Sequence, residues 1–218
     1  MSRSILSLIS VAFLGASLVA AEPKLGSELG KEVRVPSNLG FSTNVSPDAH
    51  AATILFDNLI VEVSPAQKGA AATHNQTAIQ SKVATLHIPY KTDLRSVKMT
   101  MDLRGFADVD PAATVRLVAC VGDRTEVVDL SADKAKKVEL KGKVKCILTK
   151  EYPDAQFGDW QSRIAFTVQT HAANPVLQVT LFLLIEHDTD AADAGGALLA
   201  VDSLDLEIAK PGKAAYGQ

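Results

Sequence analysis

Hydrophobic and polar residues alternate with a period of two along much of this chain. In the clearest run, apolar residues face one way and polar residues the other: Val97, Met99, Met101 and Leu103 against Lys98, Thr100, Asp102 and Arg104. A period of two is that of a β-strand with one face in the core and one in water. The pattern returns from Ser162 to Gln169. We therefore expect an amphipathic strand in each place.

Two other runs are apolar on both faces. Thr53–Val63 is broken only by Asp57-Asn58, and Val176–Glu186 is almost wholly apolar. Such composition is typical of buried strands, so we expect Thr53–Val63 to be buried on both faces and Val176–Glu186 to be a central strand. We interpret Thr53–Val63 as one long strand with a bulge at the polar step, the alternative being a hairpin turn at Asp57-Asn58. A similar Asp-polar-Leu pattern recurs within Val201–Ile208.

The succession of these runs predicts an all-β protein. About ten strand-like segments are separated by Gly, Pro and polar turn signals, and no convincing amphipathic helix interrupts them. This is typical of a single antiparallel β-sandwich, jelly-roll-like, and no linker divides it. We place the sandwich at residues 45–209, after an extended leader at residues 22–44. Residues 210–218 are expected to form a flexible tail.

The first residues have the composition of a signal peptide. Arg3 provides the positive charge, Ile5–Leu18 is apolar, and Val19-Ala20-Ala21 offers the small residues of a cleavage site. The apolar run is shorter than the roughly 20 residues that span a bilayer. We therefore predict cleavage after Ala21 and a secreted or extracellular protein, which in a bacterium could be periplasmic or held at the cell surface.

The charge balance bears on the class of partner. The formal net charge is −3 and becomes −4 without residues 1–21, because Arg3 is the one charged residue there. A nucleic-acid-binding protein would carry a basic stripe, which this chain lacks. The lysines between Lys134 and Lys145 are interleaved with Asp133 and Glu139. We expect a protein or polysaccharide partner, no nucleic acid and no membrane span.

Cys120 and Cys146 are the two cysteines of the chain. In a secreted protein an even pair predicts one disulfide, and closing a loop of 26 residues would contribute about 3.5 kcal/mol. Two free thiols are the alternative. Intact-mass analysis with alkylation but no reduction separates the two.

A polar stretch, Glu151–Trp160, is rich in aromatic residues and is expected to be a loop. Tyr152, Phe157 and Trp160 could form a platform on which sugar rings stack, or a patch that contacts a protein partner. The alternative is that these rings anchor the loop in the core. Trp160 shares its strand parity with Ile164, Phe166 and Val168, which favours burial.

Two weaker patterns concern metal binding and glycosylation. Asp188, Asp190 and Asp193 precede a Gly-Gly pair and could offer oxygen ligands to Ca²⁺, although a solvated acidic turn explains them as well. Asn44 and Asn75 each begin an N-glycosylation sequon, which matters only if the source is eukaryotic.

No enzyme signature accompanies these residues. The chain has no nucleophile elbow, zinc-binding His pair or phosphate-binding glycine loop, and its histidines are scattered. We therefore predict no cofactor and no catalytic residue. Dispersed carboxylates of a glycan-active hydrolase would escape this test.

Several short motifs resemble one known family. They are Ser46-Pro-Asp48, Ala52-Thr-Ile-Leu-Phe-Asp57, Leu86-His-Ile-Pro89 and Leu103-Arg-Gly-Phe-Ala107 followed by Asp110. Their order and spacing resemble a secreted family of filamentous fungi and some bacteria, the domain of unknown function numbered four thousand three hundred and sixty. The likeness covers Asn44–Val118 and, more loosely, Trp160–Ile208. Family members typically carry further cysteines, including one before the first strand, where this chain has none.

The resemblance implies secretion and a β-rich domain and assigns no activity. From the residues we expect a secreted, non-enzymatic β-sandwich that binds a partner at the cell surface or in the extracellular matrix. The alternative is a carbohydrate-binding module that uses the Tyr152, Phe157 and Trp160 stretch, with a hydrolase as a further possibility.

Overall fold

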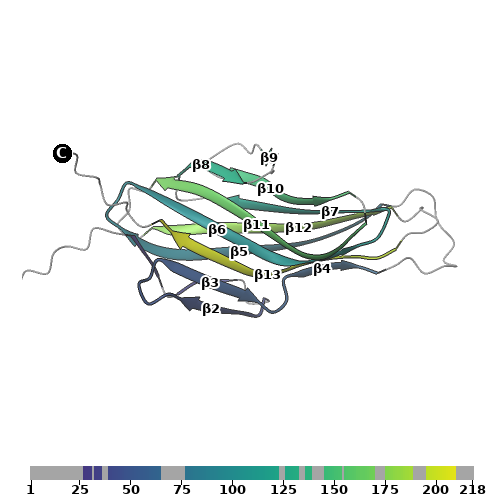
Figure 1. Ribbon diagram of the computed structural model, residues 1–218, viewed down its shortest axis with the longest axis horizontal. Coiled ribbons are helices and arrows are strands. Elements are labelled where there is room, and N and C mark those ends of the chain that lie inside the picture. The colour runs from purple at the N-terminus through teal and green to yellow at the C-terminus, as the bar shows by residue number, and fades with distance from the viewer. Residues whose placement is uncertain are drawn as a thin grey trace, which may run out of the picture.

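The computed structural model consists of two antiparallel β-sheets packed face to face (Figure 1). It describes residues 27–30, 32–35, 39–64, 77–122, 126–132, 136–138, 145–153, 155–169, 175–188 and 195–209; for residues 77, 78, 126–132, 136–138 and 188 it describes the backbone alone. None of the described residues is helical, so no helix of this part of the chain could cross a membrane. The predicted all-β sandwich is confirmed.

The first sheet contains six strands. In spatial order they are β1 (Ser27–Leu29), β5 (Thr77–Thr92), β12 (Val176–Asp188), β7 (Ala113–Val121), β10 (Lys145–Tyr152) and β9 (Lys136–Val138). β12 lies between β5 and β7 and pairs with both, as its apolar composition predicted.

The second sheet contains seven strands and faces the viewer in Figure 1. Its order is β2 (Phe41–Val45), β3 (Ala51–Phe56), β13 (Ala197–Ile208), β6 (Ser96–Val109), β11 (Gln156–Gln169) and β8 (Glu126–Ala132), and β4 (Ile60–Val63) also pairs with β13.

The core fills the space between the sheets. β6 turns Val97, Met99, Met101 and Leu103 inward, as the alternation predicted, and all four are buried. The inward residues of β12, from Leu177 to Ile185, are fully buried opposite them. Burying an aliphatic side chain of this size contributes about 1.5–3 kcal/mol, so the two inner faces supply most of the driving force for folding.

The prediction of one long strand from Thr53 to Val63 is wrong. β3 ends at Phe56, β4 begins at Ile60, and both pair with β13. The expected bulge lies in β13 instead, where the pairing with β6 skips Asp202. The backbone nitrogen of Val201 donates to the carbonyl of Leu59 at 2.9 Å, so the bulge lies beside the break. The two polar steps that resemble each other in sequence are therefore neighbours in space.

Burial on both faces was predicted wrongly for Thr53–Val63, and the central strand β12 also exposes an apolar residue. Leu55 and Ile60 point outward from the second sheet and Phe182 points outward from the first, and all three are exposed. A two-layer sandwich covers only one face of each sheet.

Two predicted segments need new boundaries. The leader at residues 22–44 is partly built into the sandwich, because β1 pairs with β5 and Phe41–Asn44 pair with β3. The predicted loop Glu151–Trp160 is mostly strand, since β10 continues to Tyr152 and β11 begins at Gln156. The predicted signal peptide and the tail at residues 210–218 lie outside the described residues.

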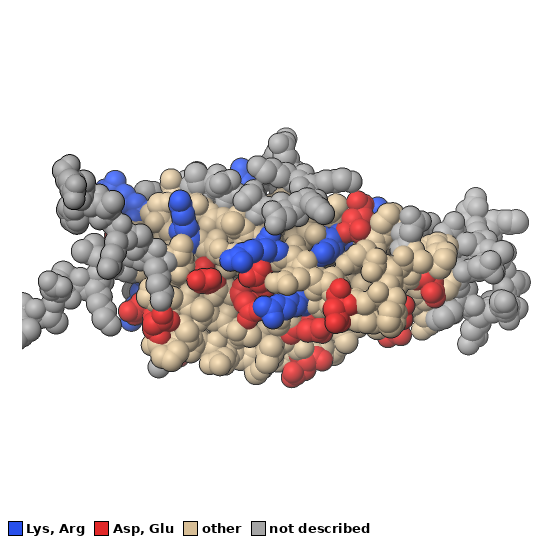
Figure 2. Space-filling model, viewed as in Figure 1, with Lys and Arg blue, Asp and Glu red and all other residues tan. Residues whose placement is uncertain are grey.

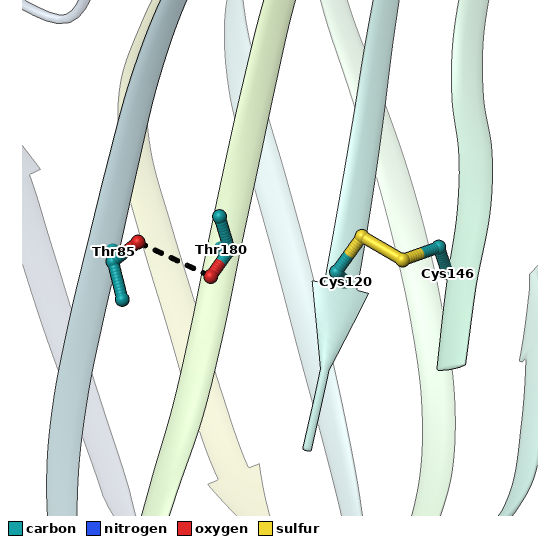
Figure 3. Close-up of a disulfide and its surroundings, with 4 residues drawn as sticks. All are labelled: Thr85, Cys120, Cys146 and Thr180. Atoms are coloured by element: carbon teal, nitrogen blue, oxygen red, sulfur yellow. Dashed lines mark hydrogen bonds between the residues drawn. A yellow bond between two sulfur atoms is a disulfide. The ribbon is translucent and has the colours of Figure 1, made fainter. Parts of the chain in front are cut away.

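The predicted disulfide joins Cys120 of β7 to Cys146 of β10. The two cysteines are directly opposite each other in the strand pairing. Figure 3 shows the bridge in line with Thr85 and Thr180, whose hydroxyl groups are 3.2 Å apart on β5 and β12. Both cysteines are buried, although their side chains leave the sheet on its outer face.

Candidate functional site

The outer face of the second sheet carries both aromatic and charged side chains. Figure 2 views the molecule from this side and shows acidic and basic side chains gathered around the middle of the face. Because side chains alternate along each strand, the residues that face solvent here are those between the core positions of β13, β6 and β11.

An aromatic pair lies on this face. Phe157 of β11 is 75% exposed. Its ring packs edge to face against Phe106 of β6, with centroids 5.2 Å apart and planes at 90°. This geometry satisfies the quadrupoles of both rings and contributes about 0.5–1.5 kcal/mol beyond area burial. Phe106 thus holds Phe157 in a defined position while leaving most of its surface free.

Carboxylates surround the pair. Asp108 is directly opposite Phe157, and Asp159 is directly opposite Phe106 in the β6–β11 pairing. Asp202 projects from the bulge in β13. Partial desolvation raises the pKa of Asp202, and the negative charge of Asp159 raises it further. We call the surface formed by Phe106, Phe157, Asp108, Asp159 and Asp202 the aromatic–acidic face.

A row of ionic contacts borders the aromatic–acidic face. Arg104 lies 3.4 Å from a carboxylate oxygen of Asp205, and the hydroxyl of Thr53 donates to Asp205 at 2.6 Å. Farther along, Arg163 lies 3.9 Å from Asp102. These pairs join β3, β13, β6 and β11, although exposed pairs contribute little individually. Arg104 and Arg163 thus have carboxylate partners of their own, outside the aromatic–acidic face.

The three aromatic residues singled out in the sequence do not form one platform. Trp160 is buried, as its parity favoured, and its Nε1 has no hydrogen-bond partner among the described residues. Tyr152 is half-buried against the core in the first sheet, and burial raises the pKa of its hydroxyl. Phe157 is therefore the one member of the three that is available to a partner.

Gly105 explains why Trp160 can lie inside. Gly105 is opposite Trp160 in β11 and opposite Val201 in β13. A Cβ atom at this position would lie 2.6 Å from Cζ2 of the indole and would also overlap the carbonyl of Ala200. The missing side chain makes room for the indole directly beneath the aromatic–acidic face.

The remaining candidates gain no support. Asp190 and Asp193 lie outside the described residues, as does Asn75, and only the backbone of Asp188 is described. Asn44 is exposed on β2. Within the part of the chain that the structure describes, no three His, Cys, Asp or Glu side chains gather where they could hold a metal ion.

Sequence reasoning missed Phe106, Asp108, Asp159 and Asp202. A signal for Phe106 was present, because it follows Lys98, Thr100, Asp102 and Arg104 on the solvent-facing parity of β6. An aromatic residue on the wet side of an amphipathic strand indicates either a contact on that face or a binding role. In β11, Phe157 likewise shares the solvent-facing parity of Asp159 and Gln161. That these strands are neighbours was not visible in the sequence.

Comparison with known proteins leaves the function open. No protein-family model matches the chain, and neither does any curated protein. Among solved structures, the chain is similar to a family 11 carbohydrate-binding module from Clostridium thermocellum, in complex with a beta-1,3-1,4-mixed-linked tetrasaccharide. The identity is 10%, the TM-score is 0.18, and the match covers 84% of this chain and 96% of that one. Likeness at this level says nothing about a ligand, and the family resemblance stays a prediction.

Proposed function

We propose that this chain is a non-enzymatic, extracellular binding protein and that its aromatic–acidic face holds an uncharged polysaccharide. The observation that carries the proposal is Phe157, which is 75% exposed and yet held in place by Phe106 among carboxylates. A large apolar side chain that stays exposed while a neighbouring ring fixes its position is expected on a surface that a partner covers.

The chemistry of the face favours a sugar chain. The C–H face of a pyranose ring packs on an aromatic ring, and its hydroxyl groups donate to carboxylate oxygens. Asp108, Asp159 and Asp202 provide such acceptors around Phe106 and Phe157. The same negative charges disfavour anionic polymers and nucleic acids.

The backbone beneath the face is suited to an extended ligand. β13, β6 and β11 pair over most of their lengths, and their outward side chains lie in rows across the strands. Row by row, the outward residues next to the aromatic pair are Ile60, Ala200 and Asp159 around Phe106, and Glu62, Leu198 and Asp108 beside Phe157. Such a surface offers apolar and hydrogen-bonding positions side by side along the sheet.

Retention on insoluble polysaccharides tests the proposal. The purified chain and its Phe157→Ala variant are incubated with glucan, cellulose and chitin, and the unbound fraction is measured. We expect retention on at least one polymer, weakened about 5- to 30-fold by Phe157→Ala, as for the loss of a 1–2 kcal/mol contact.

Phe182→Ala is the matched control, because it removes an exposed phenylalanine from the other sheet. It should bind as the unmodified chain does. Absence of retention on every polymer refutes the saccharide, and equal loss in both variants refutes the assignment of the face.

A further inference from the structure

Among the described residues, one edge of the first sheet is unpaired along much of β5. β5 pairs with β12 from Thr77 to Pro89 on one side. On the other side β1 covers only Tyr90–Thr92, and a single bridge joins His87 to Arg34. Among the described residues no strand pairs with residues 77–86 on that side. A long open edge offers a ready-made template for another strand.

The bridge at His87 identifies which backbone groups point outward. The nitrogen and the carbonyl of His87 both bond to Arg34, each at 2.9 Å. Hydrogen-bonding direction alternates along a strand, so the odd-numbered residues of β5 direct their N–H and C=O groups to the open edge. These residues are Ile79, Ser81, Val83 and Thr85.

The side chains of these residues continue an apolar surface. Ile79 is 62% exposed and Val83 is 49% exposed on the outer face of the sheet. Val83 lies beside Phe182 of β12, which is 40% exposed, and beyond it come Val118 of β7 and Leu148 of β10 in the same row. This apolar row therefore runs across four strands and reaches the open edge.

We infer that a second copy of this chain occupies the edge. The two β5 strands would pair antiparallel about a two-fold axis at Ser81, so that the two sheets become one. A two-fold contact requires a self-complementary surface, and this edge meets the requirement because Ile79 would face Val83 of the partner subunit. The three outward residues from Ile79 to Val83 would form about six hydrogen bonds, two for each pair.

Charge excludes the neighbouring register with the axis at Lys82. Lys82 is the one charged residue between Ile79 and Thr85. An axis at Lys82 would place the two lysines directly opposite each other, which is unfavourable. With the axis at Ser81, Lys82 faces the neutral Gln80 of the partner subunit. Within its own chain, the Lys82 ammonium group donates to the carbonyl of Asn58 at 2.6 Å, which directs it toward the second sheet.

Pairing at this edge also joins the two apolar rows. Phe182 and Val83 of one subunit would continue into Ile79 of the partner subunit, and the reverse holds by symmetry. The aromatic–acidic face lies on the other sheet and would stay free. The inference is therefore independent of the proposed function, and either can fail without the other.

The test measures mass and hydrogen exchange against concentration. The purified chain is studied by sedimentation velocity over about a hundred-fold range of concentration. We expect the mass to rise toward twice that of the chain, and the amides of residues 79–83 to exchange more slowly as the dimer forms.

Ser81→Pro is the decisive variant. It removes an N–H that points to the open edge, where proline costs no bond within the chain. Ser81→Ala keeps the N–H and is the matched control. We expect Ser81→Pro to abolish the dimer and Ser81→Ala to keep it. If circular dichroism shows that Ser81→Pro does not fold, Val83→Lys replaces it and should weaken association at least about 10-fold.

Two results overturn the inference. The first is a chain that stays monomeric over the whole range of concentration, whether or not its edge amides are protected. The second is a dimer that survives a folded Ser81→Pro or Val83→Lys variant, which would place the contact elsewhere.

Discussion

Removing the Cys120–Cys146 bridge should destabilise the folded protein, because the bridge closes the segment of chain between β7 and β10 into a loop. Between the two cysteines the chain forms β8, which pairs with β11 in the second sheet, and β9, which pairs with β10 in the first. The bridge joins the two ends of this segment. Without it, the unfolded chain gains freedom, whereas the strand pairing of β7 with β10 keeps the folded positions the same.

The magnitude follows from the loop that the bridge closes. For a sequence separation of 26 residues the chain-entropy relation gives about 3.5 kcal/mol at 25 °C. In a protein of this size each kcal/mol lowers the melting temperature by about 2–4 °C, so the Cys120→Ala/Cys146→Ala variant should melt about 7–14 °C lower. Both cysteines are buried, and the loss of their packing acts in the same direction.

Differential scanning calorimetry with and without a reductant tests this reasoning. The reductant should lower the melting temperature of the unmodified chain and leave that of the double variant unchanged. A double variant that melts within about 3 °C of the unmodified chain would refute the loop-entropy estimate. Two alkylated thiols in the unreduced protein would refute the bridge itself.

Two further predictions concern the bulge in β13 and its neighbours. Gly105→Ala should destabilise the fold by about 1–3 kcal/mol in urea denaturation, because its Cβ would meet Cζ2 of Trp160 at 2.6 Å; a change under about 0.5 kcal/mol would show that the strands yield freely. Asp202→Asn should raise the melting temperature at pH 7. The pKa of Asp202 is raised in the folded protein, so the contribution of this carboxyl to stability is full below its ordinary pKa of 3.8. That contribution is lost as the pH rises through the raised pKa. The gain should vanish below pH 3.8, and an equal gain at pH 3 and pH 7 would contradict this cause.

The periodicity of single strands was readable from the sequence. The alternation of Val97 to Leu103 assigned the inner and outer faces of β6 correctly, because side-chain direction in a strand depends only on position along that strand. The disulfide was predictable from composition, since two cysteines allow only one pairing.

Strand ends were harder to place where the cause lay in a neighbour. The break after Phe56 accompanies a bulge at Asp202, which lies far away in the sequence and adjacent in the sheet. Asp57-Asn58 marks the place of the interruption, but nothing within Thr53–Val63 shows that both resulting strands pair with β13. The same limit placed Tyr152 and Phe157 in one loop, although they belong to strands of different sheets.

The sequence by itself determined the all-β class, the inward face of each amphipathic strand and the pairing of the cysteines, because these depend on local side-chain alternation and on composition. The tertiary structure alone decided that Phe106 packs against Phe157, that the charge of Asp159 raises the pKa of Asp202, and that no described strand pairs with residues 77–86 of β5 on its outer side. Each of these depends on which strands are neighbours and in what register, and long-range pairing of that kind leaves no local mark in the chain.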